Sequence, residues 1–148
     1  MTKTNQRIGI VAARFNQVVT EKLVNGAVQT LKQAGIPAAA ITVIWVPGAL
    51  ELARTARLLG DSGQVDGIIA VGAVIRGETS HYDAVCAETT RGLGQASLTG
   101  PVPVLFGVLT TDDLYQALNR AGGKAGNKGS ECATGVLEML AVQTQLIK

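Results

Sequence analysis

The chain has 148 residues, an apolar content of 47% and a formal net charge of +2. This length suits a single domain with a sizeable hydrophobic core, which we expect to cover residues 1–148. The weak charge, without any basic run, argues against nucleic-acid binding, and no segment is apolar for long enough to span a membrane.

The start of the chain and its cysteines indicate in which cellular compartment the protein works. No apolar stretch typical of a signal peptide follows the first basic residues, so we expect a cytoplasmic protein. In a reducing cytoplasm Cys86 and Cys132 should be free thiols, and both lie in stretches with helical spacing. Two distant cysteines and one histidine do not have the spacing of a zinc site, so we expect no metal.

Four short apolar runs alternate with stretches of helical spacing. The runs are nearly continuous, which is typical of strands covered on both faces in a parallel sheet. Gly35 with Pro37 should end the first helix, and Thr111 is a plausible N-cap for the fourth. In chain order we expect a strand at 7–13, a helix at 20–35, a strand at 41–46, a helix at 49–60, a strand at 66–75, a helix at 81–100 that Gly92 and Gly94 loosen, a strand at 102–109, a helix at 111–123 and a last helix at roughly 130–147.

This alternation predicts right-handed crossovers and therefore an α/β protein. We expect a three-layer α/β/α sandwich around a four-stranded, mostly parallel sheet of the flavodoxin-like kind. Ligands of such folds bind beyond the carboxyl ends of the strands. That rule selects four places, namely Arg14–Asn16, Pro47–Glu51, Arg76–His81 and the residues around Phe106.

His81 is the only histidine of the chain and follows the expected strand at 66–75. Gly77, Thr79 and Ser80 precede it and can offer backbone N–H groups to an anion at the start of a helix. An imidazole is also the side chain best suited to move protons near neutral pH. The alternative is a histidine that only hydrogen-bonds to the backbone at a helix start.

The glycine-rich segment 120–131 carries Arg120, Lys124 and Lys128 at intervals of four residues. It matches neither the Walker pattern nor G-x-G-x-x-G, so it indicates only that an anion could bind. The solvated basic end of a helix fits the segment equally well. Phe15 and Phe106 should lie near strand ends, where a flat heterocycle could stack on a ring, although both could simply fill the core.

Several motifs occur in the order found in one enzyme family. They read "RFN", "VPGALEL", "GAVIRGETSHYDAV", "PVLFGVLTTDD" and "NRAGGKAGNKGSECA" with a later "LEM". Together they resemble the 6,7-dimethyl-8-ribityllumazine synthase family from about residue 7 to residue 141. The resemblance implies a transferase of riboflavin biosynthesis without cofactor or metal. The family condenses 5-amino-6-(D-ribitylamino)uracil with 3,4-dihydroxy-2-butanone 4-phosphate, and it releases the lumazine, phosphate and water.

The resemblance also implies a role for each residue that matches the family's motifs. His81 would transfer protons. Phe15 would stack on the pyrimidine, Ala49, Leu50 and Glu51 would hold the uracil edge and ribityl chain, and Ala73, Val74 and Ile75 would line the heterocycle. Glu78 and Thr79 would meet the butanone phosphate, and Arg120 would pair with its phosphate group. Phe106 would close the pocket. Lys128 and Glu131 match positions near the site without a settled role. Several relatives have a small residue in place of Glu78, whose carboxylate is unfavourable beside a phosphate unless it points away.

The family implies a homo-pentamer with its active site between adjacent subunits, where Phe106, Arg120 and Lys128 come from the neighbour. Some members stack twelve pentamers into an icosahedral capsid, a 60-mer, and riboflavin synthase is a partner that the resemblance allows. The uninterrupted segment 120–131 resembles that of capsid-forming members, yet many relatives have several more N-terminal residues, so pentamer and capsid both stay open. Two other readings also stay open: a non-catalytic flavin- or nucleotide-binding module and a shell protein without activity.

Overall fold

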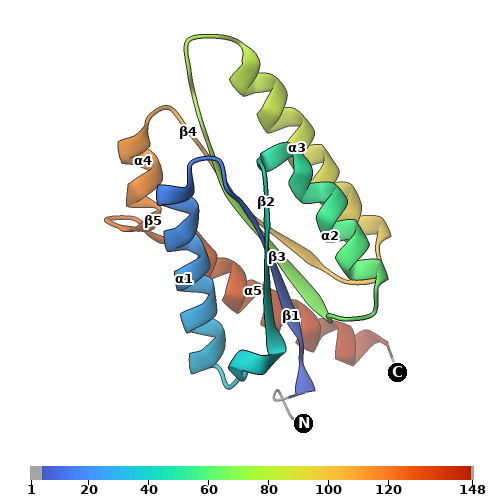
Figure 1. Cartoon of the computed structure of the whole chain (residues 1–148). Helices are drawn as coiled ribbons and strands as arrows, with labels where there is room; N and C mark the ends of the chain where they lie inside the picture. The colour runs from blue at the N-terminus through green and yellow to red at the C-terminus, as the bar shows by residue number, and fades with distance from the viewer. Residues whose placement is uncertain (1–4, 148) are drawn as a thin grey trace.

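A four-stranded sheet with helices on both faces forms the protein, whose computed structural model describes residues 5–147 (Figure 1). Residues 1–4 and 148, which the expected domain includes, lie outside the described part. The strands β1 (Ile8–Ala13), β2 (Ile41–Val46), β3 (Gly67–Ile75) and β4 (Val104–Thr111) have the order β2-β1-β3-β4. Every pair is parallel, so the expected sandwich is confirmed and its sheet is fully rather than mostly parallel.

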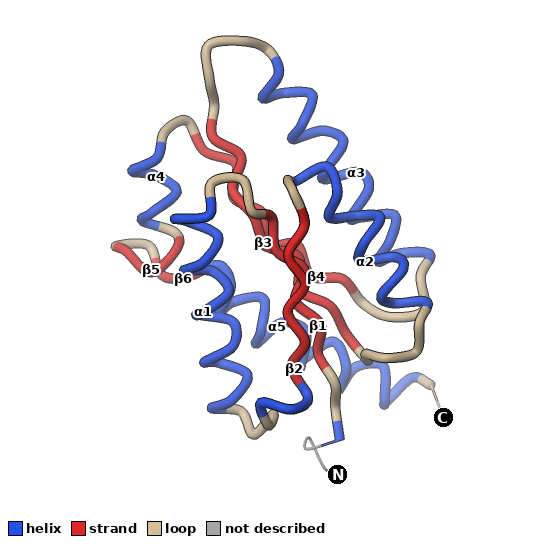
Figure 2. The backbone as a smooth tube through the Cα atoms, in the orientation of Figure 1, coloured by secondary structure: helices blue, strands red, loops and turns tan. Residues whose placement is uncertain are grey.

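The apolar runs are continuous because successive side chains of a strand enter different cores. Ile8 and Ile10 of β1 pack with helices α1 (Gln17–Gln33) and α5 (Lys128–Leu146). Val11 and Ala13 pack on the opposite face with α2 (Leu52–Asp61) and α3 (His81–Thr99). Figure 2 shows these two helix pairs on either side of the strands. Since neither face of the central strands meets water, a polar residue in them would be buried without a partner.

Helix boundaries follow local capping. After α1, the backbone N–H of Gly35 donates to the carbonyl of Lys32, and this glycine has a φ of 100°, as the sequence indicated. The fourth helix, α4 (Leu114–Asn119), is capped by Asp113 instead of the expected Thr111. A carboxylate oxygen of Asp113 accepts from the backbone N–H of Gln116 at 2.8 Å, so the carboxylate of Asp113 defines the start of the helix.

The two glycines expected to loosen α3 leave it continuous over 19 residues. A Cβ at Gly92 would lie 2.8 Å from the Cβ of Ala53 on α2, so this glycine allows the two helices to approach closely. Short 3₁₀ turns, η2 (Ala38–Ala40) and η3 (Ala49–Glu51), flank β2 on either side. The second of these places residues 49–51 directly after a strand end.

The basic segment 120–131 is a small hairpin rather than a helix end. The antiparallel strands β5 (Ala121–Gly123) and β6 (Gly126–Asn127) pair, and α5 begins at Lys128 rather than at residue 130. Gly126 has a φ of 84°, a conformation that other residues rarely adopt. Asn127 fixes the hairpin, because its side chain accepts from the N–H of Ser130 at 3.0 Å and donates to the carbonyl of Lys22 on α1 at 3.0 Å.

The strand order reverses direction between β1 and β3, and this switch point leaves a crevice at the carboxyl ends of the two strands. The connections that follow β1, β2 and β3 all leave the sheet at that edge, as the sequence predicted. Among the described residues, no helix combines the length and the apolar character needed to cross a membrane.

Candidate functional site

Two separate cavities lie at the carboxyl edge of the sheet. The first has a volume of about 450 Å³, and the second has about 620 Å³. The first is lined by Phe15, Asn16, Pro47, Gly48, Ala49, Leu50, Glu51, Ala73, Val74, Ile75, Gly77, Thr79, His81, Tyr82 and Val85. The second is lined by Phe106, Val108, Leu109, Thr110, Thr111, Gln116, Asn119, Arg120, Ala125, Lys128 and Glu131. The residues that the sequence selected are thus divided into two groups.

Phe15 forms an open shelf on the first cavity. Its side chain is 72% exposed, although a phenyl ring in a folded protein is usually covered. The next residue, Asn16, adopts the left-handed conformation with a φ of 63°. Its side-chain amide donates to the carbonyl of Ala73 in β3 at 2.7 Å. This bond joins the shelf to the buried strand end that forms the floor of the cavity.

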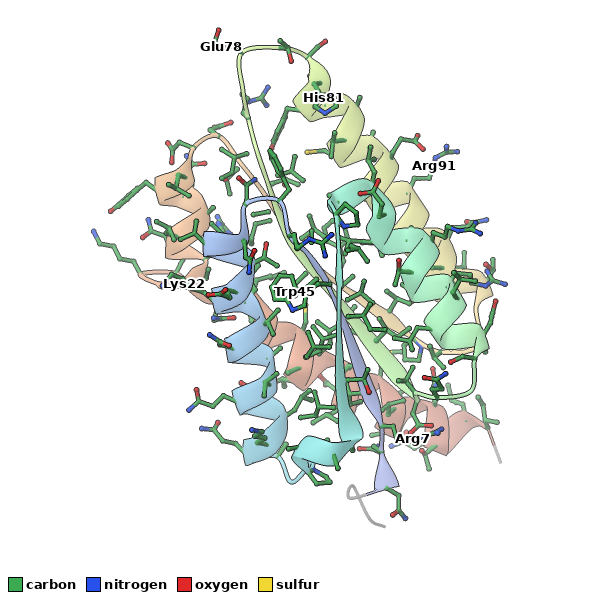
Figure 3. The ribbon with its side chains drawn as sticks, in the orientation of Figure 1. Arg7, Lys22, Trp45, Glu78, His81 and Arg91 are labelled. Carbon is green, nitrogen blue, oxygen red and sulfur yellow. The ribbon has the colours of Figure 1, made fainter. Side chains whose placement is uncertain are left out.

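The β3–α3 loop forms a second wall. The hydroxyl oxygen of Thr79 accepts from the backbone N–H of His81 at 3.3 Å, which organises the first turn of α3. Within residues 5–147, the backbone N–H groups of Glu78, Thr79 and Ser80 have no protein acceptor. Figure 3 places His81 at the start of α3 and Glu78 at the tip of the loop with its side chain pointing outward. Free N–H groups beside a helix start suit an anion, and the carboxylate of Glu78 does not oppose it there.

The turn after β2 supplies the third wall. The N–H of Glu51 donates to the carbonyl of Gly48 at 3.2 Å and closes η3. The carboxylate of Glu51 is exposed and forms no ion pair with any residue between 5 and 147. It can therefore accept hydrogen bonds from the hydroxyl groups of a ligand, as the resemblance implied.

The second cavity gathers the basic residues. The carbonyl of Arg120 accepts from the N–H of Lys128 at 2.8 Å, so the hairpin brings the two cations together. The ammonium of Lys128 lies 3.7 Å from a carboxylate oxygen of Glu131. The guanidinium of Arg120 has no ionic partner within the described part of the chain, and its five donors stay available for an anion.

Phe106 is not at a strand end, contrary to the sequence-based expectation. It is the third residue of β4 and pairs with Ala70, whereas the strand continues to Thr111. The sequence suggested an earlier end because the polar pair Thr110 and Thr111 follows the apolar run. Both are β-branched and favour an extended backbone at the edge of a sheet, so the strand extends past the run.

Sequence reasoning missed several lining residues. Tyr82 lines the first cavity beside His81, and an aromatic residue next to the only histidine was the available signal. Gln116 and Asn119 line the second cavity from α4, where only their polarity on a short helix could have marked them. Among the residues to which the resemblance gave a catalytic or substrate-binding role, Glu78 alone lines neither cavity.

Cys132 follows Glu131 on α5 but is a poor candidate for a nucleophile. Burial raises the pKa of its thiol to about 11, and the charge of Glu131 adds to this effect. The nearby Lys128 opposes it. Cys86 and Cys132 are both free, and both lie on helices as expected. Within residues 5–147, no group of three or more His, Cys, Asp and Glu side chains could hold a metal ion.

Comparison with known proteins decides between the readings that the geometry allows. The family model described as 6,7-dimethyl-8-ribityllumazine synthase matches residues 5–144. The chain belongs to this family. A 6,7-dimethyl-8-ribityllumazine synthase of Pediococcus pentosaceus is 58% identical over 137 residues, which cover 93% of this chain and 88% of the relative. One of Levilactobacillus brevis is 58% identical over 140 residues, which cover 95% of this chain and 89% of the relative.

The expected function is thereby confirmed: the protein is an enzyme of riboflavin biosynthesis, a lumazine synthase with transferase activity. Neither a non-catalytic flavin-binding module nor an inactive shell protein remains the better reading. The flavodoxin-like fold also agrees with the family. The first cavity, with its aromatic shelf and its imidazole, lies at the place where such a fold binds ligands.

Proposed function

We propose that each active site of this lumazine synthase combines the first cavity of one subunit with the second cavity of its neighbour. The first cavity would take 5-amino-6-(D-ribitylamino)uracil, with the pyrimidine on Phe15 and the ribityl hydroxyls at Glu51. The neighbour would supply Arg120 for 3,4-dihydroxy-2-butanone 4-phosphate. The assembly would be a cytoplasmic homo-oligomer, a pentamer in its smallest form, built from one domain per chain.

The observation that carries this proposal is the division of the candidate residues within one chain. His81 and Phe15 line one cavity, whereas Arg120 and Lys128 line another. A reaction that moves protons while phosphate leaves needs an imidazole and a cation at the same substrate. A second copy that places its guanidinium over the first cavity meets this need, as sites between subunits commonly do.

The residues match the steps of the condensation. The uracil's amine attacks the ketone and forms an imine as water leaves. A proton then leaves the adjacent carbon, its electron pair expels phosphate, and the resulting enol becomes a ketone. The ribitylamino nitrogen attacks that ketone and closes the second ring with loss of water. His81 would carry these protons, and the guanidinium of Arg120 would stabilise the departing phosphate through paired hydrogen bonds.

The remaining residues hold the reactants. The side chains of Ala73, Val74 and Ile75 would line the heterocycle, and residues 49–51 would follow its edge. Thr79 and the N–H groups around Glu78 would face the phosphate, since they have no protein acceptor. Phe106 and Lys128 would close the site from the neighbour. Such positioning supplies much of the rate on its own, so no single side chain is indispensable.

Co-assembly of two impaired variants, assayed at a butanone phosphate concentration well below the KM of Arg120→Ala, tests the sharing of the site. His81→Ala and Arg120→Ala chains are expressed together in equal amounts with different tags, and mixed oligomers are isolated by both tags. In a ring with shared sites, about a quarter of the sites combine an intact imidazole with an intact guanidinium. We expect lumazine formation near a quarter of the native rate. Oligomers of either variant alone are the controls, and activity no higher than their mean would refute a shared site.

Steady-state kinetics of the single variants test the two roles. We expect His81→Ala to lower kcat by about 10- to 100-fold without abolishing turnover, because positioning persists. Arg120→Ala should mainly raise KM for the butanone phosphate. An unchanged kcat for the first variant would remove His81 from the proton transfers. A rise in KM for the uracil alone would remove Arg120 from the phosphate site.

A further inference from the structure

Arg76 fastens the base of the loop that carries His81. It is the first residue after β3, and its backbone N–H donates to the carbonyl of Thr111 at 2.9 Å, which extends the contact between β3 and β4. Its side-chain Nε donates to a carboxylate oxygen of Asp112 at 3.1 Å. The resemblance gave no role to Arg76, and this residue lines neither cavity.

The same guanidinium also holds the first turn of α3. Its central carbon lies 4.4 Å from the ring centre of Tyr82, within the range of a cation–π contact. Its Nη1 lies 3.8 Å from a carboxylate oxygen of Asp83. Tyr82 and Asp83 directly follow His81, so one side chain ties the histidine's helical turn to the residue that follows β4.

The charges around Arg76 argue against a substrate-binding role. Two carboxylates, those of Asp112 and Asp83, share the one guanidinium, so the cluster carries a net negative charge. A phosphate would be repelled there, in contrast to the unpaired Arg120. The hydrogen bond to Asp112 and the charge of Asp83 also raise the pKa of Arg76, although burial opposes them.

A purely stabilising role also fits poorly. The side chain of Arg76 is 49% exposed, and those of Asp112 and Asp83 are 67% and 70% exposed. Ion pairs as open as these contribute little to folding stability. The three contacts of its guanidinium instead join Asp112, which follows β4, to Tyr82 and Asp83 in the first turn of α3.

We propose that Arg76 is a positioning residue that holds His81 in register with the first cavity. This inference rests on the proposed role of His81. Loss of the guanidinium would free the first turn of α3 to shift, and a displacement of about 1 Å at a reacting group can cost as much as 100-fold in rate. The effect should fall mainly on kcat, because the aromatic shelf of Phe15 and the guanidinium of Arg120 from the neighbour keep their places.

The experiment compares Arg76→Gln and Arg76→Lys with a matched control, Arg91→Gln. Arg91 lies on α3, the helix that begins with His81, and pairs with Glu88 at 3.1 Å, away from both cavities. Lumazine formation is measured with each substrate varied in turn, and melting temperatures are recorded at one protomer concentration. We expect Arg76→Gln to lower kcat about tenfold or more with KM values within about threefold of native. The lysine variant should regain part of the loss, and the control should match the native enzyme.

A double-variant cycle with His81→Ala shows whether Arg76 acts through the imidazole. If it does, adding Arg76→Gln to His81→Ala lowers kcat by less than about twofold. An equal loss in both backgrounds overturns the inference, and so does a rise in KM for the butanone phosphate at unchanged kcat. A melting temperature lowered in proportion to the loss of rate would also overturn it. If Arg76→Gln does not assemble, Asp112→Asn breaks the same link from the exposed side and should give the same pattern.

The outcomes separate this inference from the proposed function. A native rate for Arg76→Gln beside a slow His81→Ala refutes only the positioning role. A native rate for His81→Ala refutes the catalytic role of the histidine and, with it, the role of Arg76.

Discussion

Asn16 offers a sharp test of how the shelf of the first cavity is held. Its backbone is left-handed, with φ 63° and ψ 41°, and its side-chain amide donates to the carbonyl of Ala73 at 2.7 Å. β1 pairs with β3 only as far as Val71, so this amide bonds to a carbonyl of β3 that lies beyond the last residue paired with β1. Asn16→Gly removes the side-chain bond but tolerates the backbone, whereas Asn16→Ala removes the bond and strains the backbone.

The magnitudes follow from these two contributions. Leaving a largely buried carbonyl without its partner costs about 1–2 kcal/mol of unfolding free energy, and both variants lose this amount. A left-handed alanine costs about 1 kcal/mol more. We therefore expect the free energy of unfolding of Asn16→Ala to be about 1 kcal/mol lower than that of Asn16→Gly. This difference corresponds to about 2–4 °C in melting temperature for a chain of this size.

The assay is urea unfolding followed by circular dichroism at one protomer concentration, because assembly adds to the apparent stability. The m-values of the two variants should agree, so that the midpoints report stability alone. Equal midpoints for the glycine and alanine variants would refute the claim that the left-handed backbone matters. A glycine variant as stable as the native protein would refute the claim for the side-chain bond.

Two further predictions concern α5 and its thiol. A Cβ at Gly129 would collide with the backbone carbonyl of Leu23, so Gly129→Ala should lower the free energy of unfolding by about 1–3 kcal/mol. The control is Gly94→Ala on α3, whose Cβ meets nothing within 4 Å and which should raise that free energy by about 0.5–1 kcal/mol. Both are measured by thermal or urea unfolding, and equal stabilities would contradict the close helix contact. With a pKa of about 11, Cys132 should resist iodoacetamide at pH 8 in the native protein and react readily in urea, as read by mass spectrometry. Equal labelling in both states would contradict its burial.

The sequence predicted the sheet because burial on both faces leaves a clear pattern. The strand at 41–46 was located at its observed bounds, and the others were placed within two residues at each end, because continuous apolar runs have few other uses in a chain of this size. Because parallel strands all end at the same edge of the sheet, the rule that ligands bind beyond the carboxyl ends of the strands could be used without coordinates. His81, Phe15 and Glu51 were selected in this way, and they line one cavity.

The tertiary structure alone decided how these residues are grouped and held. The left-handed turn at Asn16, the clamp of Arg76 on Asp112 and the hairpin that joins Arg120 to Lys128 each depend on partners distant in sequence or on glycine conformations. Local patterns carry no record of such contacts, because a residue's spacing fixes its face on one element and not its partner on another. The order of apolar and polar residues therefore determined the layers and the edge of the sheet at which the candidate site lies. The packing of those layers separated the imidazole from the guanidinium into two cavities, because each follows a different strand of the sheet.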